Sequence, residues 1–218
     1  MIERPNLLIG EDLPPEPHQQ RSLEKRARLK AAGLALFGEK GYEGTSIDDI
    51  ARKANLAVGG FYQHFRSKRQ LLLALMDELL ENLNQLDLRP KPASDVRAGL
   101  RELLSSGFSA DLRYLGAYRA WQEAVLSDSD LAQKQKEIRA WTTARVTIGL
   151  QLLQKLPGAR SGVDIPALAR VLDTFFRSLL AQAAQLKQTD LNLWIPSVTH
   201  LIYHAIFTDE QPKRGRTK

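Results

Sequence analysis

The sequence predicts an all-α protein. Along most of its 218 residues, apolar side chains recur every three or four positions, the period of a helix with one buried face. No segment alternates apolar and polar residues as a half-buried strand does, and we find no internal repeat. The chain is 43% hydrophobic and 26% charged, which is typical of a globular protein with a sizeable core.

The first 20 residues predict an arm without regular structure. Residues 1–20 contain four of the ten prolines and show no periodicity. We therefore expect an arm that is disordered or only loosely docked.

A first helix is expected from about residue 21 to residue 40, with Gly41 as its C-cap. Its buried stripe is predicted to be Leu29, Ala32, Gly33, Leu36 and Phe37. Its start is basic, with Arg21, Lys25, Arg26, Arg28 and Lys30. Positive charge at a helix N-terminus opposes the helix dipole, a local cost that is understandable if phosphates bind nearby.

Residues 45–65 predict two short helices joined by a tight turn. An apolar stripe at positions 47, 50, 51 and 54 marks the first helix, and Thr45 is expected to cap it with Asp48 closing a capping box. Residues 55–57 form the turn, and residues 58–64 form the second helix. A long helix from 68 to 84 follows, capped by Ser67. Two short helices at a steep angle are typical of a helix-turn-helix.

This segment resembles the N-terminal domain of the TetR family of bacterial transcriptional regulators. The residues that carry the resemblance are Thr45-Ser46, Ile50-Ala51, Ala54, Gly59, Phe61-Tyr62, His64-Phe65 and Ser67-Lys68. The resemblance covers residues 21–84. It implies a three-helix DNA-binding domain followed by a helical ligand-binding and dimerisation domain. It also implies a dimeric regulator of double-stranded DNA, most often a repressor released by a small effector.

The charge distribution supports a nucleic-acid partner. Between Arg21 and Arg69 there are 11 Lys and Arg against 5 Asp and Glu, so this segment contains the whole formal net charge of +6. A charge run is usually a solvated surface, but its coincidence with a helix-turn-helix favours nucleic acid.

Phosphate contacts position a protein on DNA and base contacts specify the sequence. The predicted phosphate contacts are Thr45, Tyr62 and Lys68, and Ser46 is a further predicted DNA-binding residue. The predicted base-reading set is Val58, Gly59, Gly60, Gln63 and His64. In this set a Gln side chain can pair with adenine, and a Val side chain can contact a thymine methyl group.

The recognition helix departs from the family pattern at two positions. Ala57 stands where a capping hydroxyl is usual, which gives up about 1 kcal/mol. Gly60 stands where Ser or Thr usually contacts DNA, and the adjacent glycines cost about 2 kcal/mol of helix propensity. We therefore expect residues 57–64 to be poorly ordered without DNA.

The C-terminal half is expected to form a second domain over residues 94–207, after a Pro-containing boundary at 89–93. Its predicted helices cover about 94–109, 113–126, 128–156, 165–186 and 191–207. A loop at 156–162 is the clearest break in this half. The basic tail, 208–218, is expected to be disordered.

The resemblance implies that the last two helices pair with a second copy in a four-helix bundle. The predicted dimer residues are Leu172, Phe176, Leu179, Ala183, Leu201 and Ile202. The alternative is that these residues only fill the core of a monomer.

The middle helices contain aromatic residues that could surround a largely apolar or aromatic effector. The predicted effector set is Phe108, Tyr114, Tyr118, Trp121, Gln122, Trp141, Thr142, Arg145 and Phe175. Each aromatic residue is by itself more often part of a core than of a pocket.

The sequence offers two other function classes. His200 and His204 are four apart, as in a two-histidine metal site, but Leu201 replaces the Glu of HExxH and no third ligand is evident. With no nucleophile motif and no phosphate-cradling glycine loop, the sequence predicts neither an enzyme nor a metal or cofactor. The second alternative is a helical protein-interaction module with lost or non-specific DNA binding.

The sequence also predicts a cytoplasmic location. No stretch approaches the roughly 20 apolar residues of a membrane span, and the N-terminus lacks the order of a signal peptide. The absence of cysteine excludes disulfides and thiolate metal sites.

Overall fold

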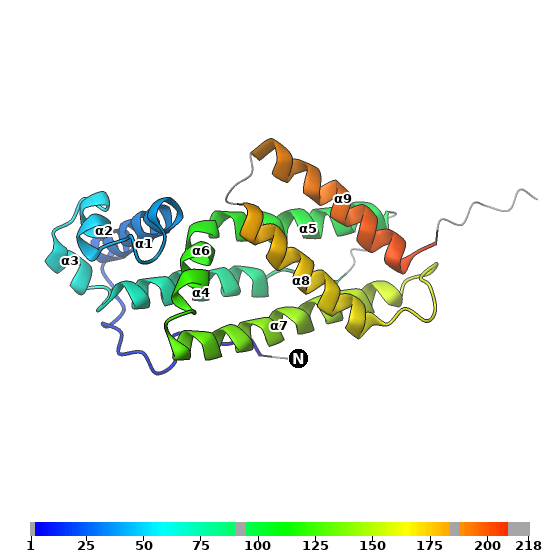
Figure 1. Cartoon of the computed structure of the whole chain (residues 1–218), viewed down its shortest axis with the longest axis horizontal. Coiled ribbons are helices and arrows are strands. Elements are labelled where there is room, and N and C mark those ends of the chain that lie inside the picture. Colours follow the sequence, from blue (N-terminus) through cyan, green and yellow to red (C-terminus); the bar gives the residue numbers. More distant parts are fainter. Residues whose placement is uncertain (1–2, 90–94, 184–187, 209–218) are drawn as a thin grey trace, which may run out of the picture. The chain divides into compact units, whose positions relative to one another are not determined.

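The computed structural model describes residues 3–89, 95–183 and 188–208 (Figure 1). In these ranges every regular element is a helix, apart from an isolated β-bridge between Ala159 and Phe207, so the predicted all-α fold is confirmed. The helices are α1 (Gln20–Lys40), α2 (Ile47–Lys53), α3 (Val58–Tyr62), α4 (Lys68–Asn84), α5 (Val96–Arg113), α6 (Leu115–Ala124), α7 (Ser129–Gln154), α8 (Ile165–Ala183) and α9 (Gln188–Ile206). Most of the predicted boundary at 89–93 and of the tail at 208–218 lies outside the described residues.

The helix-turn-helix forms where the sequence predicts it, with one change of cap. Ser46, and not Thr45, caps α2 by accepting a hydrogen bond from the Asp49 N–H at 3.0 Å. Asn55 sits in the turn with φ of 59°, a left-handed conformation that asparagine tolerates. Ser67 caps α4 as predicted, by accepting from the Gln70 N–H.

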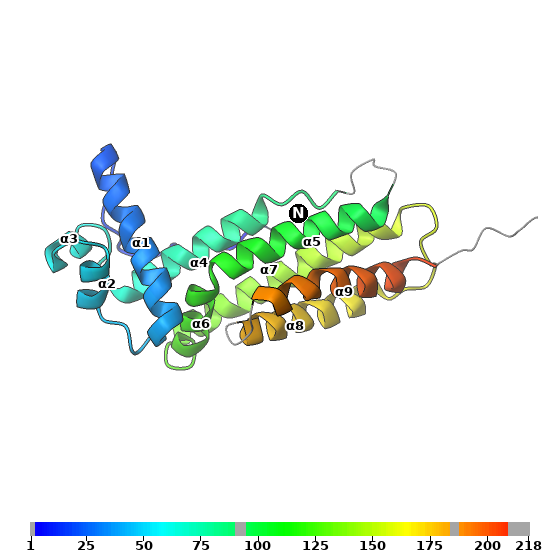
Figure 2. The same ribbon diagram turned by 90° about the horizontal axis from the view of Figure 1, so that it is seen from above.

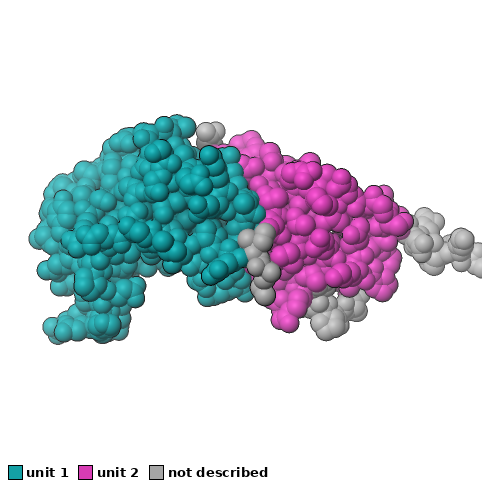
Figure 3. Space-filling model, turned by 90° about the horizontal axis from the view of Figure 1, so that it is seen from below, with its two compact units in different colours: residues 1–85, 109–141 teal, residues 86–108, 142–218 magenta. Residues whose placement is uncertain are grey.

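The chain packs into two compact units (Figure 3). Unit 1 comprises residues 1–85 and 109–141, and unit 2 comprises residues 86–108 and 142–218. This grouping differs from the predicted boundary near residue 90 because α6 packs on α1 and α4 and so joins the helix-turn-helix unit.

Unit 1 has its core around α1, α4 and α6. Trp121, Trp141, Phe37, Phe61 and Phe65 are all fully or almost fully buried in one continuous cluster. Helix α6 lies beside the C-terminal part of α1 (Figure 2). The two backbones are so close that a Cβ added to Gly116 would lie 2.1 Å from the Leu34 carbonyl oxygen.

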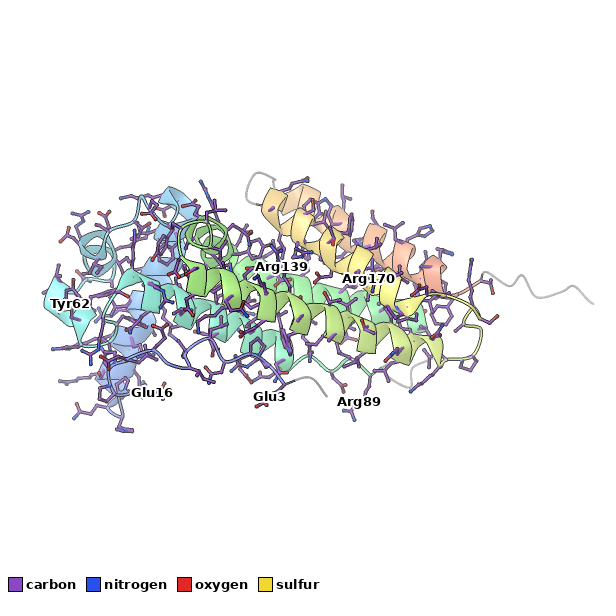
Figure 4. The ribbon with its side chains drawn as sticks, turned by 60° about the horizontal axis from the view of Figure 1, so that its bottom comes forward. Glu3, Glu16, Tyr62, Arg89, Arg139 and Arg170 are labelled. Atoms are coloured by element: carbon purple, nitrogen blue, oxygen red, sulfur yellow. The ribbon has the colours of Figure 1, made fainter. Side chains whose placement is uncertain are left out.

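The N-terminal arm packs on α4, in contrast to the predicted disordered or loosely docked segment. Leu7 is fully buried in the unit 1 core, and its N–H donates to the Asp77 carboxylate at 3.0 Å. The Arg4 guanidinium pairs with Asp77 at 2.7 Å and with Glu81 at 3.0 Å. Figure 4 shows the arm between the labelled residues Glu3 and Glu16.

Unit 2 is a helical cluster of its own. Helices α8 and α9 pair, as Figures 1 and 2 both show, and they share a core with α5 and the second part of α7. Its buried side chains include Leu100, Leu150, Ala169, Val198 and Ile206. Among the described helices of the whole chain, none is long and apolar enough to cross a membrane.

Candidate nucleic-acid interface

Helix α3 presents a solvent-exposed face. Tyr62 is 50% exposed and Val58 is 38% exposed, and Gln63 follows them at the surface. Figure 4 labels Tyr62 on this helix. On the opposite face Phe61 and Phe65 are completely buried, with their ring centroids 5.8 Å apart. The two phenylalanines fix the helix, so the exposed tyrosine and glutamine are available to a partner.

The two glycines of α3 are free of close packing. A Cβ on Gly59 would meet nothing within 4 Å, and one on Gly60 would meet only the Leu56 side chain at 3.5 Å, an ordinary contact. Ala57 provides no side-chain cap, as the sequence predicts. The fold of the free protein therefore does not require glycine at either position.

We expect Gly59→Ala and Gly60→Ala each to stabilise the protein by about 0.5–1 kcal/mol, because alanine is the better helix former. Amide exchange of residues 57–64 should slow in both variants. Urea unfolding and exchange mass spectrometry measure the two effects. Gly41→Ala is the opposite control: its φ is 74°, and an added Cβ would lie 2.5 Å from the Glu123 carboxylate. Unchanged exchange in the α3 variants would contradict the expected disorder.

Thr45 does not face the solvent, which corrects the predicted phosphate contact. Its side chain is buried, and its hydroxyl donates to the Gly41 carbonyl oxygen at 2.7 Å. The hydroxyl thus ties the end of α1 to the start of α2. Ser46, one residue on, is exposed and occupies the cap. The motif predicts that a hydroxyl group caps this helix, but it does not distinguish between two adjacent hydroxyl residues.

His64 is buried beneath the motif, which does not support the predicted base contact. It is 2% exposed, and neither ring nitrogen has a hydrogen-bond partner among the described residues. Burial lowers the pKa of His64, and the positive charges of Arg26 and Lys25 lower it further. The imidazole is therefore neutral in the folded protein and fills space between α1 and the recognition helix.

This burial predicts a pH dependence of stability. The unfolded chain binds a proton at His64 below about pH 6.5, whereas the folded chain binds it only at lower pH. The free energy of unfolding is therefore unaffected by His64 above about pH 6.5, and it falls as the pH is lowered towards the folded pKa. The slope from this residue is at most about 1.4 kcal/mol per pH unit. Urea unfolding of His64→Leu between pH 7 and pH 5 should show a shallower loss than wild type. Parallel curves would mean that His64 does not titrate differently on folding.

Lys68 has intramolecular partners. Its ammonium donates to the Tyr42 carbonyl oxygen at 2.8 Å and to the Thr45 carbonyl oxygen at 3.3 Å. It also lies 4.4 Å from the centre of the Tyr42 ring, a cation–π contact. Burial is the main reason that the pKa of Tyr42 rises to about 12. Lys68 therefore stabilises the loop before α2. A phosphate would have to bind the Lys68 ammonium alongside these two carbonyl oxygens.

The start of α1 contributes uncompensated positive charge. Arg21 and Arg28 are exposed, Lys25 is half-buried, and none of them has an acidic partner within 4 Å in the described part of the chain. Arg26 was not singled out by the sequence as a positioning residue. Its guanidinium donates to the His64 carbonyl oxygen at 3.3 Å and lies 4.8 Å from the centre of the Phe65 ring, so it fixes the end of the recognition helix against α1.

Comparison with known proteins agrees with this geometry. The family model described as bacterial regulatory proteins, tetR family, matches residues 29–75, the region from the middle of α1 to the first part of α4. The helix-turn-helix region of the chain is therefore that of the TetR family.

Named relatives share this N-terminal region. TetC of transposon Tn10 from Escherichia coli is 42% identical over 64 residues, which are 29% of this chain and 32% of TetC. The biofilm operon negative transcriptional regulator IcaR of Staphylococcus aureus strain Newman is 31% identical over 87 residues, 39% of this chain and 47% of IcaR. The chain thus spans less than half the length of these curated relatives. IcaR is named as a regulator and not as an enzyme, in agreement with the sequence prediction.

Solved structures of two other regulators share the fold over most of the chain. SmeT, the repressor of the Stenotrophomonas maltophilia multidrug efflux pump SmeDEF, superposes with a TM-score of 0.63 at 18% identity, covering 89% of this chain and 98% of SmeT. The fatty acid degradation regulator FadR of Bacillus halodurans gives a TM-score of 0.67 at 17% identity, covering 86% of this chain and 96% of FadR. These likenesses show that the C-terminal helices follow the fold expected of a TetR-family protein.

The predicted effector residues are divided between the two compact units. Unit 1 contains Tyr114, Tyr118, Trp121, Gln122 and Trp141, and unit 2 contains Phe108, Thr142, Arg145 and Phe175. Trp121 and Trp141 are core residues, and the Trp121 indole N–H donates to the Gln135 side-chain oxygen. Phe175 is 36% exposed on α8.

Two polar residues of the effector set already have partners inside unit 2. Thr142 donates to the Asp173 carboxylate at 2.9 Å, and Arg145 donates to the Leu86 carbonyl oxygen at 3.1 Å. Burial lowers the pKa of Arg145. In unit 1 the sequence missed Asp111, whose desolvation raises the pKa of its carboxyl to about 7. No motif marks this residue, because the effect depends on how α5 packs.

Three of the six predicted dimer residues lie in the chain's own core. Leu172, Ala183 and Ile202 are buried among side chains of the same protomer, so they are not free to contact a second copy. Phe176 and Leu179 are half-buried, and Leu201 is 56% exposed. The sequence missed other exposed apolar residues on the same two helices, which are Val171 at 64% and Leu193 at 67%.

The histidine pair on α9 has a different partner from the metal that its spacing suggests. The Arg97 guanidinium lies 2.8 Å from His200 Nδ1, and since arginine only donates, Nδ1 accepts. The rings of His200 and His204 are 4.2 Å apart. The described residues bring no third His, Cys, Asp or Glu to this pair. Arg97 and His200 instead line a groove of about 670 Å³ between the start of α5 and α9.

Proposed function

We propose that this TetR-family protein is a sequence-specific DNA-binding transcriptional regulator that acts as a homodimer on a palindromic operator and is released by a small, largely apolar or aromatic effector. The observation that carries the proposal is the exposed face of α3, where Tyr62, Gln63 and Val58 project from a helix anchored by buried phenylalanines. We assign DNA binding to residues 21–84 and effector binding and dimerisation to residues 94–207.

In the DNA complex α3 would lie in the major groove. The Tyr62 hydroxyl would donate to a phosphate, the Gln63 amide would pair with an adenine edge, and Val58 would contact a thymine methyl group. Gly59 and Gly60 would allow a close approach, because they add no side chain between helix and groove. The uncompensated basic start of α1 would add phosphate contacts.

A single helix-turn-helix contacts few base pairs, so specificity in a genome calls for two copies. The exposed apolar residues of α8 and α9 support such a dimer: Val171, Phe175, Leu193 and Leu201 leave an apolar surface on the helix pair. A second copy would cover these side chains and place two α3 helices against successive major grooves, about 34–36 Å apart.

Effector binding would act as a population shift. A ligand can move the equilibrium between DNA-competent and incompetent states only by its differential affinity for them. The half-buried Tyr118 side chain remains our candidate for an aromatic ligand, since Tyr114, Trp121 and Trp141 belong to the core of unit 1. A second SmeT structure, 22% identical to this chain, is a complex with triclosan, and this aromatic ligand supports the proposed ligand class.

Selection of bound sequences from a random duplex pool tests the proposal. We expect a palindrome to be enriched, since two copies of α3 are related by a twofold axis. Tyr62→Phe should then weaken binding to that palindrome about 30-fold, because two hydroxyl–phosphate contacts are lost at about 1 kcal/mol each. Tyr203→Phe on α9 is the matched control and should bind like wild type.

The alternative is a helical interaction module without specific DNA binding, favoured by Gly60 in place of a hydroxyl residue. It predicts that no sequence is enriched, that binding to any duplex is weak, and that Tyr62→Phe has no effect.

A further inference from the structure

Arg66 stands between the recognition helix and α4, and the proposed interface above does not use it. It follows Tyr62 by four residues and Gln63 by three, and its side chain is 54% exposed. Its own N–H is bonded to the Gln70 side-chain oxygen at 2.9 Å, which fixes the backbone at this corner. The guanidinium is thus a cation at a fixed place beside the exposed end of α3.

In the free protein the N-terminal arm occupies this guanidinium. Arg66 Nε donates to the Asp12 carbonyl oxygen at 2.8 Å and lies 2.9 Å from the Asp12 carboxylate, and a second nitrogen of the guanidinium reaches that carboxylate at 3.3 Å. The Asp12 side chain is 83% exposed, so water and ions have access to the pair. Exposed ion pairs of this kind are weak and easily replaced.

The arm keeps its position without the Asp12 carboxylate. The buried Gln70 side chain donates to the Asp12 carbonyl oxygen at 3.1 Å, and Glu11 pairs with Arg69 at 2.6 Å. Leu7 and Pro14 are buried on either side. Loss of the carboxylate therefore changes the charge beside Arg66 without releasing the arm.

The acid that pairs with Arg66 comes from outside the helix-turn-helix. Lys40 pairs with Asp49 and Lys53 pairs with Glu39, so these cations find partners within the first two helices and their connection. The positive charges of Lys25 and Arg26 lower the pKa of His64, two residues before Arg66, so these two cations add positive charge near this corner. A phosphate bound to Arg66 would be attracted by these positive charges and repelled by the Asp12 carboxylate.

We propose that Arg66 is a further phosphate-binding residue of the DNA interface and that Asp12 of the N-terminal arm occupies its guanidinium until a DNA phosphate displaces it. This inference rests on the proposed DNA-binding function. A phosphate offers the guanidinium a bidentate, charge-assisted contact of the same kind, and it can replace the Asp12 carboxylate because exposed ion pairs are weak. The arm is then a built-in competitor that lowers affinity for every sequence alike.

The test uses the full chain and a random-sequence duplex of about 30 base pairs, roughly three helical turns, because phosphate contacts are independent of sequence. Asp12→Asn should raise affinity about two- to fivefold over Glu16→Gln, an exposed control that makes the same charge change on the same arm. Arg66→Gln should lower affinity and reduce the slope of log K against log salt by about one unit per protomer, while Arg66→Lys keeps most of that slope.

The double variant decides the coupling. With Arg66→Gln already present, Asp12→Asn should give no gain beyond that of Glu16→Gln. Three outcomes would each overturn the inference if the wild type still binds DNA. The first is an equal gain in DNA affinity from Asp12→Asn and Glu16→Gln, and the second is a gain from Asp12→Asn that persists in the Arg66→Gln background. The third is an unchanged slope of log K against log salt in Arg66→Gln. A wild type without salt-dependent binding would overturn the proposed function and this inference with it. Thermal unfolding of each variant shows that the fold is retained.

Discussion

Leu7→Ala is expected to lower the free energy of unfolding by about 2–5 kcal/mol, the usual range for removing a buried leucine side chain. Leu7 lies in the N-terminal arm, yet it is completely buried and belongs to the same cluster as Phe37 and Leu72. The cavity left by the variant would be lined by α4, which cannot collapse onto it because Arg4 and Asp77 hold the arm in place. Urea unfolding at neutral pH measures the change.

Ile9→Ala is the matched control. Ile9 is two residues away in the same arm and is 70% exposed, so its truncation should change stability by less than about 0.5 kcal/mol. Similar small effects in both variants would mean that the arm is not docked in solution. A large effect at Leu7 alone would establish that the folded DNA-binding unit begins well before α1.

The docked arm shows what sequence periodicity cannot predict. Residues 3–19 have no repeat of apolar positions, so the pattern indicates disorder. Their order comes from single contacts with α4, such as Arg4 with Asp77 and Glu11 with Arg69, which lie far away in the sequence. Complementary groups of this kind become visible only when the fold brings α4 and the arm together.

Elements with strong periodicity were predicted well. The buried stripe of α1 contains the five expected residues, and Ser67 caps α4 as predicted. These features depend on local geometry and on a single hydrophobic face, which the sequence encodes directly. The same reasoning could not tell that His64 is buried, because α3 is only five residues long and its sides are not distinguished by repetition.

Helix α8 explains the mixed outcome for the predicted dimer set. It is apolar on more than one side: Leu172 and Ala169 face the core of unit 2, while Val171 and Phe175 are exposed. A pattern of apolar residues predicts that both sides are buried, but it does not tell which side packs against the same protomer and which side contacts a partner. The structure separates the two sides, and the exposed side is the one that a second copy can cover.

Gly116→Ala should be among the most damaging small substitutions in the chain. Gly116 is in the first turn of α6, and an added Cβ would lie 2.1 Å from the Leu34 carbonyl oxygen and 2.9 Å from the Gly38 nitrogen of α1. These are backbone atoms, so no side chain can move aside and the two helices must separate. Arg119 donates to the Gly38 carbonyl oxygen at 3.0 Å and Glu123 accepts from the Tyr42 N–H at 2.7 Å, and separation would strain both bonds.

Overpacking costs about 1–3 kcal/mol and each strained hydrogen bond about 1 kcal/mol, so we expect a loss of about 3–5 kcal/mol for Gly116→Ala in urea unfolding. Gly149→Ala is the control, since Gly149 is also helical but an added Cβ meets nothing within 4 Å. That variant should gain about 0.5–1 kcal/mol from helix propensity. If Gly116→Ala gained stability as well, α6 could not lie directly on the backbone of α1. A loss confined to Gly116 would identify a rigid joint between α6 and the helix whose basic start we assign to DNA.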